Sequence, residues 1–179
     1  MKSTAQFLVA ALALSWLGVA CAGSFTLQVS TFSNGGSLPQ LQVYSGCNGA
    51  NVSPALHWSG APSATRSFAV TVFDPDAGNG GGWWHWMAYD IAPHRAGLAA
   101  TAGVSDAAGM KQGRNDFGHA RYDDPCPPPG PAHHYRVTVY ALNVAMLKPD
   151  ALTLAAVDQA IRRHALARAQ QTLLYRRYP

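Results

Sequence analysis

Four segments of the chain have the apolar patterns of β-strands. In residues 25–31, apolar residues alternate with polar ones, which is the period of two expected of a strand buried on one face. Residues 67–73 are almost continuously apolar, and residues 84–91 and 135–142 are similar. Such runs are typical of strands that are buried on both faces in the middle of a sheet. The pattern therefore predicts one half-buried strand and three central ones.

Loops rich in Gly and Pro separate these strands, and no helical pattern lies between them. Parallel strands need long crossover connections, usually helices, so their absence favours a mainly antiparallel sheet over a doubly wound α/β fold. We therefore predict a mainly β chain, built as an antiparallel β-sandwich or a related barrel.

The C-terminal segment alone has a helical pattern. Thr153 is a suitable N-cap. Apolar residues follow it at spacings of three and four, namely Leu154, Val157, Ile161 and Ala165. Residues 151–179 carry five Arg and one Asp, whereas residues 23–150 carry seven basic and eight acidic residues. The tail is thus predicted to be a basic amphipathic helix that packs on the sheet or meets acidic partners or anionic lipid head groups.

The composition is that of one folded domain. Of the 179 residues, 48% are hydrophobic and 12% are charged, which excludes a disordered chain, and the length suits a single domain. The formal net charge is +4, and every acidic residue is Asp, because the sequence has no Glu. Seventeen Gly and twelve Pro favour a turn-rich β domain, and no internal repeat or linker supports a second one.

Residues 1–22 have the features of a signal peptide. Lys2 gives a positive start, residues 7–19 form an apolar run, and residues 20–22 (Ala-Cys-Ala) have the small-x-small pattern that signal peptidase recognises. We expect cleavage after Ala22. Residues 23–179 would then be a single domain exported to the periplasm or secreted.

Two alternatives for this N-terminal segment stay open. A transmembrane anchor is one, although the apolar run is shorter than the roughly 20 residues that span a bilayer. A lipoprotein acylated at Cys21 is the other, although Leu17 lies one place too early for the usual acylation motif. Neither alternative leaves a transmembrane segment in residues 23–179.

Removal of Cys21 with the signal peptide leaves two cysteines. Cys47 and Cys126 are an even pair in an oxidising compartment, and we predict a disulfide between them, with two buried thiols as the alternative. The sequence contains no CxxC pair, so it supports neither redox catalysis nor a structural zinc site.

Acidic, aromatic and His residues gather around the loop between the second and third predicted strands. Asp-Pro-Asp-Ala at 74–77 is followed by a Gly-rich loop and then by Trp-Trp-His-Trp at 83–86. Pairing of the two strands across this loop would bring Asp74 within reach of His85. Regular alternation along the strand would place His85, Met87 and Tyr89 on one face, and Trp84 and Trp86 on the other.

A second chemically rich region follows. It contains Gly-Arg-Asn-Asp-Phe-Gly at 113–118, Asp-Pro-Cys-Pro-Pro-Pro-Gly at 124–130 and His-His-Tyr at 133–135. Four prolines in five positions make a rigid segment that cannot join a central ladder and suits the wall of a pocket. His133 and Tyr135 share one face of the next strand. An Asp, two His, a Tyr and backbone amides would together bind a small anion, with the Asp orienting a His.

These motifs resemble, in order and spacing, the phosphatidylethanolamine-binding protein family, which includes the Raf kinase inhibitor proteins. The resemblance is to its small bacterial branch. Cys-x-Gly-x-Asn-Val-Ser-Pro at 47–54 and Leu-x-Trp at 56–58 match that branch as well. The resemblance covers nearly all of the mature chain, from about residue 25 to Tyr178.

The resemblance implies an antiparallel β-sandwich with a C-terminal helix and a small surface cavity. Family members are similar in accepting phosphate, phosphoethanolamine head groups, acetate or cacodylate there. The family's pocket aspartate falls on Asp74 and its two pocket histidines on His85 and His133. Further pocket residues implied in this way are Tyr135, Pro127, Pro128 and Trp84, with Asp76 at the rim.

Three positions depart from the family's pattern. Gly78 stands where Pro usually follows the Asp-Pro-Asp-Ala unit, and His134 stands where Arg is common. Asp124-Pro125 takes the place of the Gly that often precedes Cys-Pro-Pro. An added carboxylate beside an anion pocket disfavours anions electrostatically.

The leading hypothesis is an exported binding module for a small anionic ligand, with no cofactor or metal. The pocket residues could instead form a buried polar network without a ligand. A second functional hypothesis is an inhibitor or regulator of a protease or other protein partner by surface contact, as some relatives are. Catalysis is disfavoured because the sequence lacks a Gly-x-Ser-x-Gly elbow and a His-Glu-x-x-His zinc motif. Nucleic-acid binding is disfavoured because no motif for it is visible.

Overall fold

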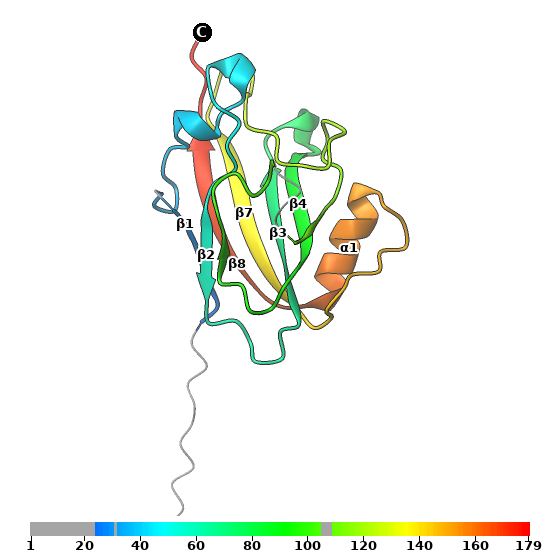
Figure 1. Ribbon diagram of the computed structural model, residues 1–179. Helices are drawn as coiled ribbons and strands as arrows, with labels where there is room; N and C mark the ends of the chain where they lie inside the picture. Colours follow the sequence, from blue (N-terminus) through cyan, green and yellow to red (C-terminus); the bar gives the residue numbers. More distant parts are fainter. Residues whose placement is uncertain (1–23, 31, 105–108) are drawn as a thin grey trace, which may run out of the picture.

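The strands form two antiparallel sheets, shown in Figure 1, in a computed structural model that describes residues 24–30, 32–104 and 109–179. The smaller sheet has the order β1 (Thr26–Val29), β2 (Leu56–Ser59), β5 (Gly97–Leu98). The larger has the order β6 (Lys111–Gln112), β4 (Trp83–Ile91), β3 (Ser67–Asp74), β7 (His133–Leu142), β8 (Ala165–Tyr175). One α-helix, α1 (Leu154–His164), and three 3₁₀ turns, η1 (Gln40–Gln42), η2 (Ser45–Cys47) and η3 (Gly78–Gly80), complete the described elements. The predicted signal peptide, residues 1–22, lies outside the described residues.

The main apolar core lies between the two sheets. Leu27 and Val29 of β1 alternate with exposed residues and pack in one cluster with Val70 and Val72 of β3 and Val137 of β7. A second cluster joins the other face of the large sheet to the helix, through Val157, Ala160 and Ile161 of α1. Because β3 and β7 are covered on both faces, their sequences are continuously apolar. The prediction of a mainly β, antiparallel fold with a C-terminal helix is confirmed.

The predicted C-terminal helix is confirmed, but it ends at His164, so the basic residues that follow it do not lie on a helix. The helix begins as expected, since the Thr153 side chain accepts a hydrogen bond of 3.3 Å from the Ala156 N–H. Ala165 then has extended backbone angles, and β8 runs antiparallel to β7 from Ala165 to Tyr175. Pairing with β7 along almost its whole length outweighs the helix propensity of an Ala-rich segment, which is a weak preference. The basic residues after His164 therefore lie on or just beyond an edge strand.

Candidate ligand-binding pocket

A cavity of about 440 Å³ lies where β3 ends and where β4 and β7 begin. Seven of the sequence-predicted site residues line it, namely Asp74, Asp76, His85, Pro127, Pro128, His133 and Tyr135. The aromatic residues Tyr44, Trp83 and Phe117 also line it, and none of these three was predicted as a site residue. The acidic Asp124, which was expected beside the pocket as a departure from the family's pattern, lines it as well. Among the described residues that line the cavity, none is Lys or Arg. The topology thus gathers residues from four separate stretches of sequence.

The buried Asp74 and the half-buried His133 form a pair at the cavity. His133 Nδ1 donates to Asp74 Oδ2 over 2.7 Å, and the Asp76 backbone N–H donates to Asp74 Oδ1 over 2.9 Å. The Asp74 residue is 1% exposed. The sequence placed Asp74 near His85, whereas its hydrogen-bond partner is the histidine of the next strand, β7. With Nδ1 bonded to Asp74, Nε2 is the ring atom of His133 that is left for a ligand.

His85 is held with its Nδ1 hydrogen on the protein. This nitrogen donates to the Asp123 backbone oxygen over 2.8 Å, because a carbonyl can only accept. Burial lowers the pKa of His85, and the Asp123 carbonyl only partly offsets this. The neutral ring therefore carries its lone pair on Nε2. Edge-on contacts with Tyr135 and Phe117, at centroid distances of 5.3 and 5.5 Å, fix the ring plane.

Tyr135 supplies a hydroxyl that stays protonated. Burial, together with the neighbouring Asp74 carboxylate, raises the pKa of Tyr135 well above its usual value. A phenolic O–H that does not ionise is a steady hydrogen-bond donor. The cavity lining therefore combines a Tyr135 hydroxyl that keeps its proton with two histidines, each of which has one ring nitrogen, Nε2, outside the hydrogen bonds described above.

A β-bulge in β4 changes which tryptophans face the cavity. The pairing Val72 with Trp86 is followed by Phe73 with Trp84, so β4 carries one extra residue at His85. Trp86 lies in the core between the sheets, as does Tyr135, the residue that His85 contacts. Trp84 instead packs on Phe73 and on the helix-side cluster that contains Met87 and Tyr89.

Two sequence expectations are corrected by this bulge. His85 does not share a face with Met87 and Tyr89, because the extra residue interrupts the alternation of the strand. Trp84 does not line the cavity, and the preceding residue, Trp83, does. Bulges follow from the pairing of two strands, so the sequence of one strand gives no signal for them.

The loop from β3 to β4 forms the rim. Asp76 accepts two hydrogen bonds on Oδ2, from the His134 backbone N–H at 2.7 Å and from His134 Nδ1 at 2.8 Å. Burial opposes ionisation of Asp76, but these hydrogen bonds from His134 outweigh it and lower the pKa of the carboxyl. Gly78 has a φ of 64°, which Pro cannot adopt, so this position accounts for one departure from the family's pattern.

The Asn-Asp-Phe-Gly motif at 115–118 positions other parts of the site. Asn115 Nδ2 donates to Asp123 Oδ2 over 2.7 Å, and His119 Nδ1 and Arg121 Nε also bond the Asp123 carboxyl. This network fixes the Asp123 backbone oxygen that receives the His85 Nδ1 hydrogen. The motif also carries Phe117, which packs against the His85 ring. Its contribution is therefore mainly to hold His85.

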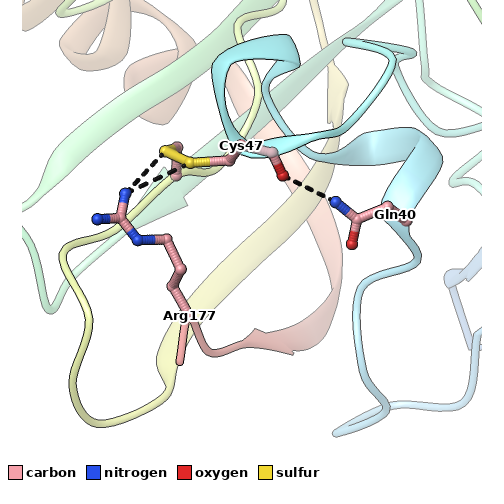
Figure 2. The surroundings of a disulfide bond; sticks show 4 residues. Gln40, Cys47 and Arg177 are labelled. Atoms are coloured by element: carbon pink, nitrogen blue, oxygen red, sulfur yellow. Dashed lines mark hydrogen bonds between the residues drawn. A yellow bond between two sulfur atoms is a disulfide. The ribbon is translucent and has the colours of Figure 1, made fainter. Parts of the chain in front are cut away.

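The predicted disulfide between Cys47 and Cys126 ties the proline-rich wall to η2 (Figure 2). Arg177 Nη1 donates to both sulfur atoms at 3.5 Å, and Gln40 Nε2 donates to the Cys47 carbonyl oxygen at 2.9 Å, as Figure 2 shows. Further along the wall, Gly130 is bonded through its N–H and its oxygen to residues 177 and 176. These links hold the wall from both of its ends.

Asp124 is the least expected member of the site. The residue is 1% exposed, and neither carboxyl oxygen has a hydrogen-bond partner in the described part of the chain. Burial, together with the neighbouring Asp123 carboxylate, raises the pKa of Asp124 to about 9. The carboxyl of the unliganded protein is therefore protonated at neutral pH, so this residue adds no charge there.

Comparison with known proteins agrees with the motifs and the fold. The model of the phosphatidylethanolamine-binding protein family matches residues 28–176. The chain belongs to this family.

Relatives in the phosphatidylethanolamine-binding protein family match most of the chain. The UPF0098 protein YbcL of Escherichia coli is 40% identical over 162 residues, covering 86% of this chain and 88% of YbcL. The crystal structure of YbcL, described as a member of the mammalian PEBP family, has a TM-score of 0.81 and is covered to 99%. LppC of Mycobacterium tuberculosis, whose name describes it as a candidate lipoprotein, is 39% identical over 146 residues, covering 81% of this chain and 69% of LppC.

Within residues 24–30, 32–104 and 109–179, no group of three or more His, Cys, Asp or Glu side chains is arranged to hold a metal ion. In the same ranges, no helix has the length and apolar character needed to cross a bilayer.

Proposed function

We propose that this member of the phosphatidylethanolamine-binding protein family binds a small ligand through an anionic group, such as a phosphate, phosphoethanolamine or carboxylate group. The observation that carries the proposal is the convergence of His133, His85 and Tyr135 on one cavity, with both imidazole rings held by the protein through Nδ1. Anchored rings present donors at fixed positions, which lowers the entropy lost on binding.

Proton uptake accompanies binding in this proposal. A neutral His85 offers a lone pair on Nε2, which repels an oxyanion, whereas the protonated ring offers an N–H. An anion in the cavity therefore favours the charged ring, or brings its own proton, as a phosphate monoester can. Tyr135 adds a donor that needs no proton from solvent.

A titration of residues 23–179 with phosphoethanolamine and inorganic phosphate, followed by amide chemical shifts, tests the proposal. Saturable shifts are expected at Asp74, His85 and His133. The variant His133→Ala removes one donor and should lose these shifts, whereas His94→Ala, at an exposed turn outside the cavity, should keep them. The absence of shifts at millimolar ligand in the wild type would reject anion binding at this site.

We also propose that the protein is exported. The apolar run at 7–19 with its small-x-small ending supports this, as does a relative whose name describes it as a candidate lipoprotein. N-terminal sequencing of the protein recovered from the periplasm or medium should find a chain that begins at Gly23. A chain that begins at Met1 and stays in the cytosol would contradict export. A chain that begins at an acylated Cys21 would show that the protein is a lipoprotein, and would contradict cleavage after Ala22.

A further inference from the structure

Two adjacent aspartates in the loop before the proline-rich wall differ in their partners. Asp123 accepts hydrogen bonds from Asn115, His119 and Arg121. Asp124 lines the cavity and is 1% exposed, yet neither of its carboxyl oxygens has a partner among the described residues. A buried polar group without a partner is costly, and it gains the most when a ligand supplies the missing hydrogen bond.

The charges around the cavity indicate what that ligand group is. Three aspartates line the cavity, and two of them are paired within the protein, Asp74 with His133 and Asp76 with His134. Asp124 is the third, and no Lys or Arg stands among the described lining residues to pair with its carboxylate form. The aromatic rings of Trp83 and Phe117 also line the cavity, and such rings attract cations through their faces.

We propose that Asp124 binds the positively charged nitrogen of the ligand, so that the pocket selects small molecules that carry a primary ammonium group as well as an oxyanion. The inference rests on the proposed function, because His133 and His85 are proposed to bind the oxyanion of the same ligand. An ammonium group supplies three N–H donors, which match the two free oxygens of a carboxylate. The cavity would thus discriminate between two ligands that differ in this group alone.

Binding of the ammonium group changes the protonation of Asp124. In the unliganded protein the carboxyl holds a proton, since burial and Asp123 raise its pKa to about 9. The ion pair forms when the O–H bond of the carboxyl breaks, the carboxylate keeps the electron pair, and the proton leaves to the buffer. The other titratable groups beside it are Tyr122 and Asp123 in its own loop, and the remaining ones at the cavity are Tyr44, Asp74, Asp76, His85, His133 and Tyr135.

A matched pair of ligands isolates this effect. Calorimetric titration with 3-aminopropylphosphonate and with propylphosphonate compares molecules that share the oxyanion and differ in the ammonium group. The wild type should bind the aminated ligand about tenfold more tightly or better, which is the strength expected of a charge-assisted hydrogen bond. In buffers of different ionisation enthalpy, the aminated ligand should release about one proton more than propylphosphonate, because the histidines respond to both ligands alike.

Asp124→Asn is the variant that tests the assignment. It keeps the shape of the side chain and removes its ability to ionise, so it should abolish both the affinity difference and the extra proton while leaving propylphosphonate binding within about threefold. Asp124→Gly is the second variant if the amide substitution does not fold. Asp150→Asn, a carboxylate that is exposed and outside the cavity, should behave as the wild type does.

The outcomes separate this inference from the proposed function. Equal affinity of the wild type for the two ligands would overturn the ammonium site while leaving anion binding in place. A preference for the aminated ligand that persists in Asp124→Asn would also overturn it. If neither ligand binds the wild type, the proposed function fails and the ammonium site fails with it.

Discussion

At the scale of single residues, the site depends on two groups held in the uncharged state, His85 and Asp124. Both are almost fully buried, and burial disfavours the charged form of each. The consequence is opposite for an acid and a base: the His85 pKa falls and the Asp124 pKa rises. At neutral pH both groups are therefore uncharged, and binding of the proposed ligand would change the protonation of each.

The Asp124 carboxyl should make the folded protein less stable as the pH rises. Its pKa is about 9 in the folded state, against an ordinary value of about 3.9, so the folded state holds a proton that the unfolded state has lost between these values. Stability then falls with rising pH across this window, by at most about 1.4 kcal/mol per unit. Asp124→Asn should be more stable than the wild type by up to about 4 kcal/mol at pH 7.

Denaturant unfolding of both proteins at several pH values measures this difference. The advantage of Asp124→Asn should vanish near pH 4 and grow up to about pH 9. Asp150→Asn, whose side chain is exposed, serves as the control that should follow the wild type. A difference between Asp124→Asn and the wild type that does not vary with pH would show that the folded carboxyl is ionised at neutral pH.

His85 should give anion binding a pH dependence. Because burial lowers its pKa, the ring is neutral at neutral pH and must gain a proton to donate from Nε2 to an anion. Anion affinity should therefore rise as the pH falls from about 8 to about 5.5, the range in which histidine titrates.

Sulfate is a suitable probe because it stays a dianion over this range. The affinity of the wild type should increase at least about tenfold towards the acidic end, since each proton taken up contributes up to a factor of ten per pH unit. His85→Gln keeps a polar side chain and should flatten the profile. A wild-type affinity that is constant with pH would contradict proton-coupled binding.

At the scale of elements, the proline-rich wall is positioned by a covalent link between distant segments. The Cys47–Cys126 disulfide closes a loop with a sequence separation of 79 residues. Replacing both cysteines with serine should lower the free energy of unfolding by about 4 kcal/mol in the chain-entropy model, because the unfolded chain gains freedom. Ligand affinity should fall as well, since the wall residues Pro127 and Pro128 lose one of their anchors. Denaturant unfolding and the phosphate titration measure the two effects.

A matched control separates the effect of losing the disulfide from the effect of replacing the cysteine side chains. Reduction of the wild type should reproduce the loss of stability seen in the double variant, and reduction of the double variant should change nothing. If reduction leaves the unfolding midpoint of the wild type unchanged, the disulfide does not contribute as described.

The elements also show where sequence patterns succeed. The buried strands β3 and β7 were predictable because a strand covered on both faces must be apolar along its length. The strand β8 was not, because Ala, Leu, Arg and Gln favour helices locally, and its extended form depends on pairing with β7. The bulge at His85 was not predicted for the same reason, since the register between two strands is a long-range property.

At the scale of the whole molecule, the pocket also has features that the sequence predicts and features that only the assembled fold determines. The sequence motifs identified seven residues that line the cavity, because a family resemblance carries three-dimensional information. The partners of those residues depend on how β3, β4 and β7 assemble, which is why Asp74 was expected beside His85 and lies hydrogen-bonded to His133. Asp124 was recognised as a departure in sequence, but its burial without partners could be known only from the fold.

The two ends of the described chain lie at opposite ends of the sandwich. Figure 1 shows β1 beginning at the lower end, while the C-terminus lies at the upper end beside η2. There the Arg177 backbone oxygen accepts from the Gly130 N–H, in the wall of the pocket. A protein tethered through its N-terminal side would therefore hold the pocket mouth away from the surface that carries it, open to solutes.

An affinity tag or fluorophore at Pro179 would, by the same geometry, crowd the pocket. Phosphonate affinity measured with the protein immobilised at residue 24 should match that in free solution, whereas attachment at residue 179 should weaken it. Equal affinities in the two orientations would show that the last residues leave the mouth clear. The choice of the tethered end thus decides whether a sensor built from this protein reports on its ligand.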